Sequence, residues 1–135
     1  MDVPEIGRPP SFGPEEWEAL KRRTRSILWE RGTLGIGINY GELARRLDLH
    51  PFAGNFFSLL DAVCLDVVAL GGPMVTALVI NIDTKLQGGR FFSLAEDIGF
   101  EVLDSMELAH AEQQRSIAWI RTHPESPGPE IAAPH

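Results

Sequence analysis

The residues best suited to metal or acid–base chemistry are scattered through this sequence. None of the four histidines has a second histidine or an acidic residue four positions away, the spacing that a helical metal site uses. They are His50, His110, His123 and His135. Acidic pairs such as Glu96 with Asp97 fit the first turn of a helix, where a carboxylate stabilises the helix dipole. We therefore expect no metal site and no catalytic carboxylates.

Motifs for nucleophilic catalysis and phosphate binding are also missing. The single cysteine, Cys64, lies inside an apolar run, which favours a packing role over a reactive thiol. The glycines of LGIGI and LQGGR do not stand between a strand and a helix with phosphate-loop spacing. No Gly-x-Ser-x-Gly motif exists. The sequence predicts no enzyme, no cofactor and no small-molecule substrate.

Basic side chains could instead hold the phosphates of a nucleic acid. The net charge is −7, and the imbalance lies in the second part: residues 1–50 carry eight acidic and eight basic side chains, whereas residues 51–135 carry eleven acidic and four basic. Acidity where a recognition helix should lie disfavours nucleic acid. If DNA were nevertheless bound, the expected phosphate contacts would be Arg22, Arg25, Arg45, Arg46, Lys85 and Arg90.

Helix signals organise the first half of the chain. Pro14 predicts a helix start and Gly32 its end. Asn39 and Glu42 have the spacing of a capping box, which starts a second helix over residues 40–47. Apolar spacing points one set of residues inward and leaves Lys21, Arg22, Arg25, Arg45 and Arg46 toward solvent. The inward set is Trp17, Leu20, Thr24, Ile27, Leu28, Leu43, Ala44 and Leu47.

The segment PFAGNFFSLLDAVCLDVVALGG predicts a third helix that ends at Gly71 and Gly72. Its inner arc consists of Phe52, Phe56, Leu59, Leu60, Val63, Cys64, Val67, Val68 and Leu70. Its outer half includes Asp61, Ala62, Leu65 and Asp66 and carries no Lys or Arg. The third helix is therefore expected to be half exposed and acidic on its outer side.

The next segment, MVTALVINIDTKLQGGRFF, predicts a β-hairpin. The first strand is β-branched, the turn contains Asp83, Gly88 and Gly89, and the second strand holds Phe91 and Phe92. Ser93 is then expected to cap a brief helix that stops at Gly99.

A final helix over residues 101–122 carries an apolar stripe spaced by steps of three and four, which suits packing against another helix. Trp119 lies off the stripe and could anchor a partner. The expected partner-binding residues are Val102, Met106, Ala109, Ile117, Trp119 and Ile120. The alternative is that this helix folds back over the first helix of the same chain.

Together these elements predict an α+β, mainly α, winged-helix-like fold: three helices plus a β-hairpin wing, with an extra C-terminal helix. We expect a flexible arm over residues 1–12, a single domain over 13–122 and a disordered tail over 123–135. The longest apolar run, around ALVINI, is far shorter than the roughly 20 residues that cross a bilayer. The start MDVPEIGRPP lacks a signal-peptide pattern. A cytoplasmic protein with no membrane contact is expected.

The run YGELARRL resembles the second helix in the winged-helix half of alkylguanine-DNA alkyltransferases and alkyltransferase-like proteins. Those alkyltransferases present their acceptor thiol in a Pro-Cys-His-Arg run, which is missing here, so the resemblance implies a fold and no alkyl transfer. YGELARRL followed by VTALVINIDTKLQGGRFF also resembles a loose group of small bacterial proteins, which implies a shared fold without an activity.

Two functions remain from the sequence. The favoured one is a protein-interaction module that binds a protein partner or a second copy of itself as a homodimer, a small regulator or inhibitor of the kind linked to bacterial defence or mobile elements. The alternative is a winged-helix transcriptional regulator whose third helix enters the major groove of DNA.

Overall fold

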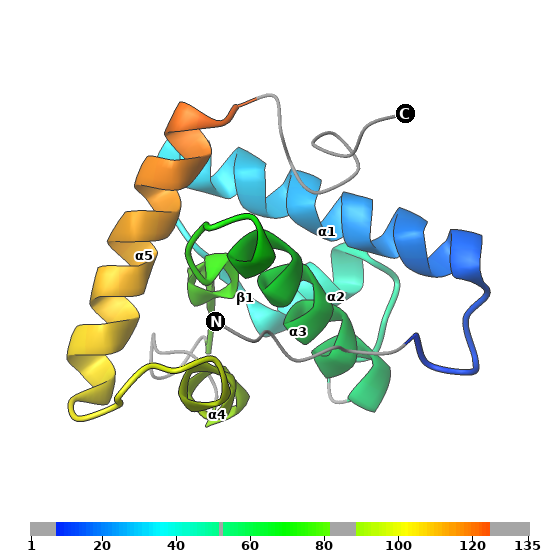
Figure 1. Cartoon of the computed structure of the whole chain (residues 1–135). Helices are drawn as coiled ribbons and strands as arrows, with labels where there is room; N and C mark the ends of the chain where they lie inside the picture. Colours follow the sequence, from blue (N-terminus) through cyan, green and yellow to red (C-terminus); the bar gives the residue numbers. More distant parts are fainter. Residues whose placement is uncertain (1–7, 52, 82–88, 125–135) are drawn as a thin grey trace.

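The computed structural model describes residues 8–51, 53–81 and 89–124. Within these ranges the chain forms five α-helices, a short 3-10 helix and a two-stranded parallel sheet (Figure 1). The predicted class, α+β and mainly α, is confirmed. No helix in these ranges is long and apolar enough to cross a membrane.

The first helix, α1 (Pro14–Leu34), begins at Pro14 as the sequence predicts, but it passes through Gly32. The helix ends instead at Gly35, which adopts the left-handed conformation (φ 74°) that glycine tolerates best. Gly32 is buried because Ile120 of the C-terminal helix packs directly against it. The predicted end at Gly32 was therefore wrong, since that glycine serves helix packing rather than chain reversal.

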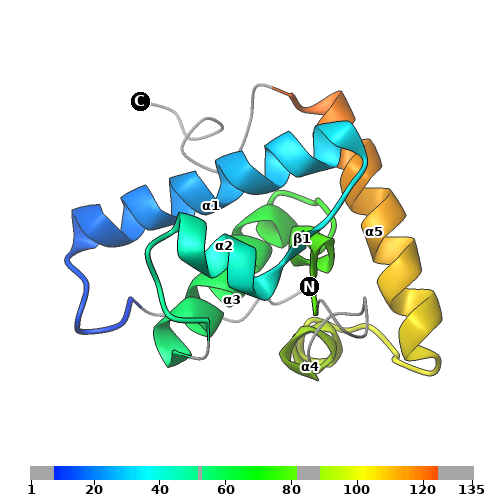
Figure 2. The ribbon, with the colours of Figure 1, turned by 180° about the vertical axis from the view of Figure 1, so that it is seen from behind.

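A short strand, β1 (Ile38–Asn39), leads into α2 (Tyr40–Arg46). Asn39 caps α2 as predicted, because its side chain accepts a hydrogen bond from the amide of Glu42 at 2.8 Å. The carboxylate of Glu42 pairs with Arg31 of α1. Both contacts fix α2 against the end of α1. Seen from behind in Figure 2, β1 and α2 lie across α3.

The third helix, α3 (Gly54–Ala69), lies in the middle of the molecule, with α1 along one side and α4 along the other (Figures 1 and 2). The predicted inner arc is buried from Phe56 to Val67, whereas Val68 is half-buried, Leu70 beyond the helix end is exposed, and Phe52 is outside the described residues. Ala62 and Leu65, which the sequence assigns to the outer half, are buried too. Two apolar clusters cover α3: one with α1 and α2, the other with α4. The expectation of a half-exposed helix was wrong because α4 covers the second side.

The predicted hairpin is not formed. The 3-10 helix η1 (Val75–Leu78) precedes β2 (Val79–Ile80), which pairs in parallel with β1. Phe91 and Phe92, expected in a second strand, belong to α4 (Gly89–Asp97), so Ser93 lies inside a helix and caps nothing. Phe91, Leu94, Ala95 and Ile98 are buried at helical spacing. Asp83, Lys85 and Gly88 lie outside the described residues, whereas the stop at Gly99 (φ 109°) is confirmed.

The last helix, α5 (Ser105–Thr122), starts at Asp104, whose side chain accepts from the amide of Glu107 at 3.1 Å. It packs against α1 and η1 and forms one edge of the molecule (Figure 1). Its buried residues are Ala109, Glu112, Ser116 and Ile120. The structure thus follows the alternative in which this helix folds back over α1.

The ends of the described chain are also packed. Phe12, in the predicted arm, stacks on Trp17 with ring centroids 5.8 Å apart. His123, in the predicted tail, stacks on Trp119, and its carbonyl oxygen accepts from the Trp29 indole at 2.8 Å. The domain therefore extends at least one residue beyond each predicted boundary.

Candidate functional site

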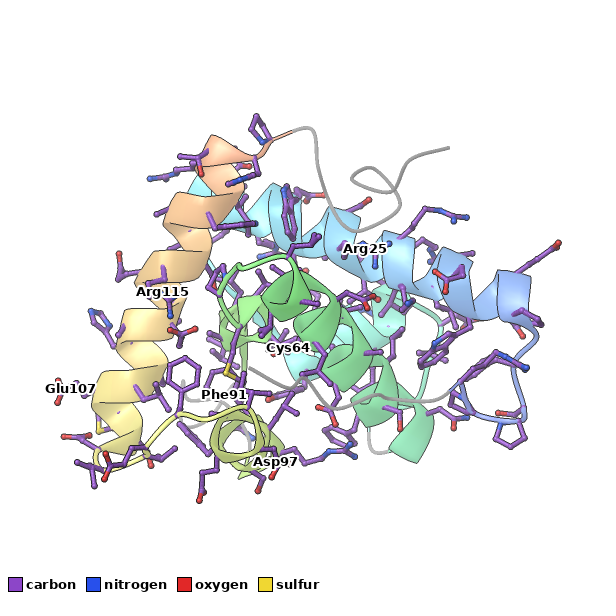
Figure 3. The ribbon with its side chains drawn as sticks, viewed as in Figure 1. Arg25, Cys64, Phe91, Asp97, Glu107 and Arg115 are labelled. Atoms are coloured by element: carbon purple, nitrogen blue, oxygen red, sulfur yellow. The ribbon has the colours of Figure 1, made fainter. Side chains whose placement is uncertain are left out.

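Cys64 belongs to α3 and lies on the side that α4 covers, near Phe91 (Figure 3). Burial raises the pKa of its thiol to about 12, although hydrogen bonding with Thr76 opposes the shift. At neutral pH the side chain is a fully protonated thiol with no access to solvent. The predicted packing role of Cys64 is confirmed.

Metal ligands are not gathered in the described part of the chain: no group of three or more His, Cys, Asp and Glu side chains there could hold an ion. His110 is exposed on α5. His123 directly follows the end of α5 and packs on Trp119.

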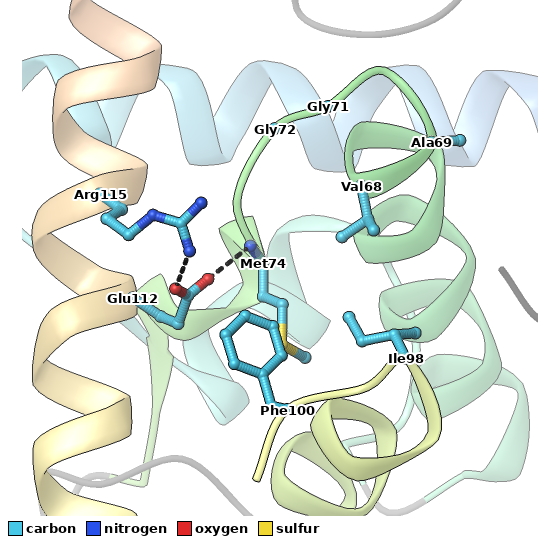
Figure 4. A pocket seen from close by; sticks show the side chains of 9 residues that line it. All are labelled: Val68, Ala69, Gly71, Gly72, Met74, Ile98, Phe100, Glu112 and Arg115. Carbon is cyan, nitrogen blue, oxygen red and sulfur yellow. Dashed lines mark hydrogen bonds and ion pairs between the residues drawn. The ribbon is translucent and has the colours of Figure 1, made fainter. Parts of the chain in front are cut away.

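A half-open pocket of about 360 Å³ lies between the end of α3, the start of η1 and α5 (Figure 4). Its walls are mostly apolar, and its only charged lining residues are Glu112 and Arg115. The other lining residues are Val68, Ala69, Gly71, Gly72, Met74, Ile98 and Phe100.

The carboxylate of Glu112 has a structural role in this pocket, because its partners are two groups of the same chain. Its side chain is 1% exposed; one carboxylate oxygen accepts from the amide of Met74 at 3.0 Å, and the other pairs with Arg115 (Figure 4). One turn later, the Ser116 hydroxyl donates to the Met74 carbonyl at 3.2 Å. Both polar groups of the Met74 backbone are thus held by α5, so the carboxylate fastens the η1 segment to the helix.

Sequence reasoning missed Glu112 and Ser116. The predicted stripe shares Ala109 and Ile120 with the face that packs, but it continues through Gln113 and Ile117 instead of the buried Glu112 and Ser116. A run of small and polar residues at Ala109, Glu112 and Ser116, spaced by three and four, was the available signal.

The start of α5 presents a second kind of site. Leu103 and Met106 are 85% and 65% exposed. We call these two residues the α5 knob. Beside them lies a groove of about 310 Å³ whose lining joins Leu103, Leu108 and Ala111 with three acidic residues, Glu101, Asp104 and Glu107. Glu107 points away from the body of the protein in Figure 3. An exposed apolar pair beside three carboxylates suits a partner that is both apolar and basic.

The six predicted partner-binding residues are divided by the fold. Met106 lies in the knob, and Val102 is half-buried beside it against the α4 cluster. Ile117 and Trp119 are half-buried against α1 and α3. Ala109 and Ile120 are 2% and 0% exposed, so they cannot meet a partner while α5 is docked. Of the six predicted residues, Met106 is therefore the one whose side chain is mostly exposed to a partner.

Arginines gather in a third place, between α1 and α2. A shallow groove of about 450 Å³ is lined by Ala19, Arg22, Arg23, Ser26, Ile27 and Arg46. We call it the arginine groove. Arg23 donates to the carbonyl of Arg46 at 2.6 Å, which fixes one guanidinium across the gap, and Arg46 lies 3.4 Å from Glu30. Arg45 is exposed on α2 without lining the groove.

The other predicted phosphate contacts lie elsewhere. Arg25, expected in solvent, is 1% exposed and lies 3.5 Å from Asp66 of α3, which also binds Lys21 at 3.0 Å. Arg25 was misplaced because α3 covers that side of α1. Arg90 pairs with Asp61 and lies over the Phe57 ring. Of the six, Arg22, Arg45, Arg46 and Arg90 are exposed, although Arg90 is paired with Asp61, and Lys85 is outside the described residues.

Asp61 and Asp66 thus have internal partners instead of an open acidic face. Burial raises the pKa of Asp61 above its ordinary value of 3.8, Arg90 opposes this shift, and Asp97 adds to it. With both sides of α3 covered, the helix expected to enter a DNA groove cannot do so in this structure.

Comparisons of the chain with protein families, with curated proteins and with solved structures give no match.

Proposed function

We propose that this protein is a non-enzymatic interaction module that binds a protein partner through the α5 knob. The exposure of Leu103 and Met106 carries the proposal, because these are the two most exposed large apolar side chains of the described chain and they lie three residues apart beside a groove. Covering them would gain roughly 25 cal/mol for each Å² of apolar surface removed from water.

The carboxylates around the knob define the chemistry of the partner. Glu101, Asp104 and Glu107 lie in one groove lining, and no described cation pairs with any of the three. A partner bearing Lys or Arg beside an apolar side chain would be steered toward this surface.

The test is photo-crosslinking of the full chain in an extract of its source cells. A photoreactive leucine analogue at Leu103 should give a discrete adduct that weakens with added salt, and Glu101→Lys with Glu107→Lys should abolish it. The matched control places the analogue at Leu34, which is 64% exposed at the far end of α1. Equal adducts from both positions, or none from Leu103, would refute the proposal.

A second candidate, nucleic-acid binding, is favoured by the arginine groove, to which Arg45 adds a neighbouring exposed cation. The burial of α3 leaves only contacts to the phosphate backbone, and the net charge of −7 opposes them. Backbone contact without base readout would be weak and non-specific. We therefore rank this function second.

For the finer fold class, we propose a winged-helix-like scaffold used for protein binding. The order of α1, β1, α2 and α3, and the cap at Asn39, support it. Phe91 and Phe92 in α4 argue against the wing as the sequence predicts it.

A further inference from the structure

We propose that the partner of the α5 knob is a second copy of this protein, which receives the knob in its arginine groove. This inference rests on the proposed interaction function and names the partner.

The two surfaces match in chemistry. The knob has two exposed apolar side chains, and the groove beside it is lined by three carboxylates, those of Glu101, Asp104 and Glu107. The arginine groove is lined by Arg22, Arg23 and Arg46 together with Ala19 and the largely buried Ile27. An apolar, acidic surface is therefore complementary in charge to a basic groove with some apolar lining.

Within the described chain, most of the charged groups on the two surfaces have no ion-pair partner; the exception is Arg46, which lies 3.4 Å from Glu30. Within the described chain, Arg22 and Arg23 have no carboxylate partner, while neighbouring Lys21 and Arg25 are engaged by Asp66. Asp104 accepts only from the amide of Glu107. Exposed pairs of this kind contribute little energy each, so they would set orientation and association rate while the knob supplies the apolar contact.

The two surfaces lie on different parts of the molecule. The start of α5 is at the lower left of Figure 1, whereas the groove residues belong to the middle of α1 and the end of α2, and Figure 2 shows the same separation from behind. One chain cannot satisfy both surfaces itself. Each copy would offer one knob and one groove, which makes the contact head-to-tail rather than two-fold symmetric.

Surfaces this small belong to the weak class of interfaces, so association is expected at about 0.1–1 mM chain and should decrease with salt. Two variants each disable one surface. Leu103→Ser with Met106→Ser removes the knob and keeps the groove. Arg22→Glu reverses one charge of the groove and keeps the knob. All three positions are exposed, so the fold should be retained, which circular dichroism and thermal unfolding would verify.

Matched controls change the same chemistry elsewhere. Leu34→Ser with Ile36→Ser removes two other exposed apolar side chains, and Arg45→Glu reverses an exposed charge beside the groove. Sedimentation velocity and light scattering of the full chain should show a mass that rises with concentration for the wild type and for both controls, and a monomer for each disabled variant.

Mixing the two disabled variants gives the decisive result. Because one keeps the groove and the other keeps the knob, the mixture should form a 1:1 dimer that does not grow further. A mixture that stays monomeric, disabled variants that associate like the wild type, or a wild type that is monomeric throughout would overturn the inference. In the last case, a crosslink from Leu103 to a foreign protein would still uphold the interaction function, and its absence would refute both.

Discussion

Gly32 of α1 and Ile120 of α5 approach so closely that a β-carbon on Gly32 would overlap Cδ1 of Ile120 and lie 3.1 Å from its Cγ2. Both residues are buried. Glycine inside a helix costs about 1 kcal/mol relative to alanine. Its presence here permits the close contact between the two helices.

Gly32→Ala should lower stability by about 1 kcal/mol, because overpacking of about 1–3 kcal/mol exceeds the gain in helix propensity. Ile120→Val removes Cδ1, so Gly32→Ala should be less harmful in that background. Urea unfolding of the four chains in a double-mutant cycle measures this coupling. Strict additivity would show that α5 does not pack on α1 as described.

Glu112 gives a second prediction. Glu112→Ala leaves the buried amide of Met74 without its acceptor and should lower stability by about 1–3 kcal/mol. Glu112→Gln retains an acceptor oxygen and should cost less. Chemical unfolding compares the two, with exposed Gln114→Ala as a control near zero. If the glutamine and alanine variants were equally destabilised, the bond to Met74 would not be the reason for the burial of Glu112.

Local signals in the sequence predicted the starts of α1 and α2 and the class of fold, but not the starts of α4 and α5, which begin at Gly89 and Ser105 instead of at residues 93 and 101. The Asn39 cap and the inner faces of α1 and α2 depend on residues within one or two turns of each other, so spacing is sufficient to find them. The end of α1 could not be found this way. Gly32 and Gly35 are both plausible stops, and only the distant Ile120 distinguishes them.

The prediction of a β-hairpin wing was wrong for a similar reason. A β-branched run has strand propensity, but only Val79 and Ile80 find a partner, and that partner is β1. Phe91 begins a helical pattern of buried residues that continues through Leu94 and Ile98. The pattern is easy to miss because the adjacent pair Phe91 and Phe92 also suits a β-strand. In the candidate site, hydrophobic spacing selected Met106, whose side chain is exposed. It could not anticipate that a carboxylate, Glu112, would occupy the packed face.

Asp61 makes stability depend on pH. Because its pKa in the folded protein is raised above 3.8, the folded state binds the proton more tightly than the unfolded state. Its contribution to stability therefore increases as pH falls through the folded pKa toward 3.8 and is unfavourable above that window. Asp61→Asn keeps an acceptor for Arg90 without the charge, so it should raise the melting temperature at neutral pH, with the advantage shrinking on acidification. A variant less stable than wild type at pH 7 would contradict this.

Cys64 should react with thiol reagents only when the protein opens. Its pKa of about 12 leaves little thiolate at pH 8, and the side chain is fully buried. Labelling should be slow in buffer and fast in denaturant, followed by mass spectrometry. Rapid labelling of the folded chain would show that α4 does not cover α3.

The last prediction concerns binding to duplex DNA, because the affinity for DNA distinguishes the two candidate functions. α3 is covered on both sides, and Asp61 and Asp66 pair with Arg90 and Lys21. Among the described members of the expected set of phosphate contacts, Arg22, Arg45 and Arg46 are exposed and not engaged by α3. A contact with about three phosphates should be weak at physiological salt and have a shallow salt slope, near −3 in a log–log plot. Fluorescence anisotropy with mixed-sequence duplex at several salt concentrations measures both quantities. Arg22→Glu should abolish any residual binding, and Leu103→Ser with Met106→Ser should leave it unchanged. Sub-micromolar binding with a steep slope would instead make DNA the primary ligand and would require α4 to move away from α3.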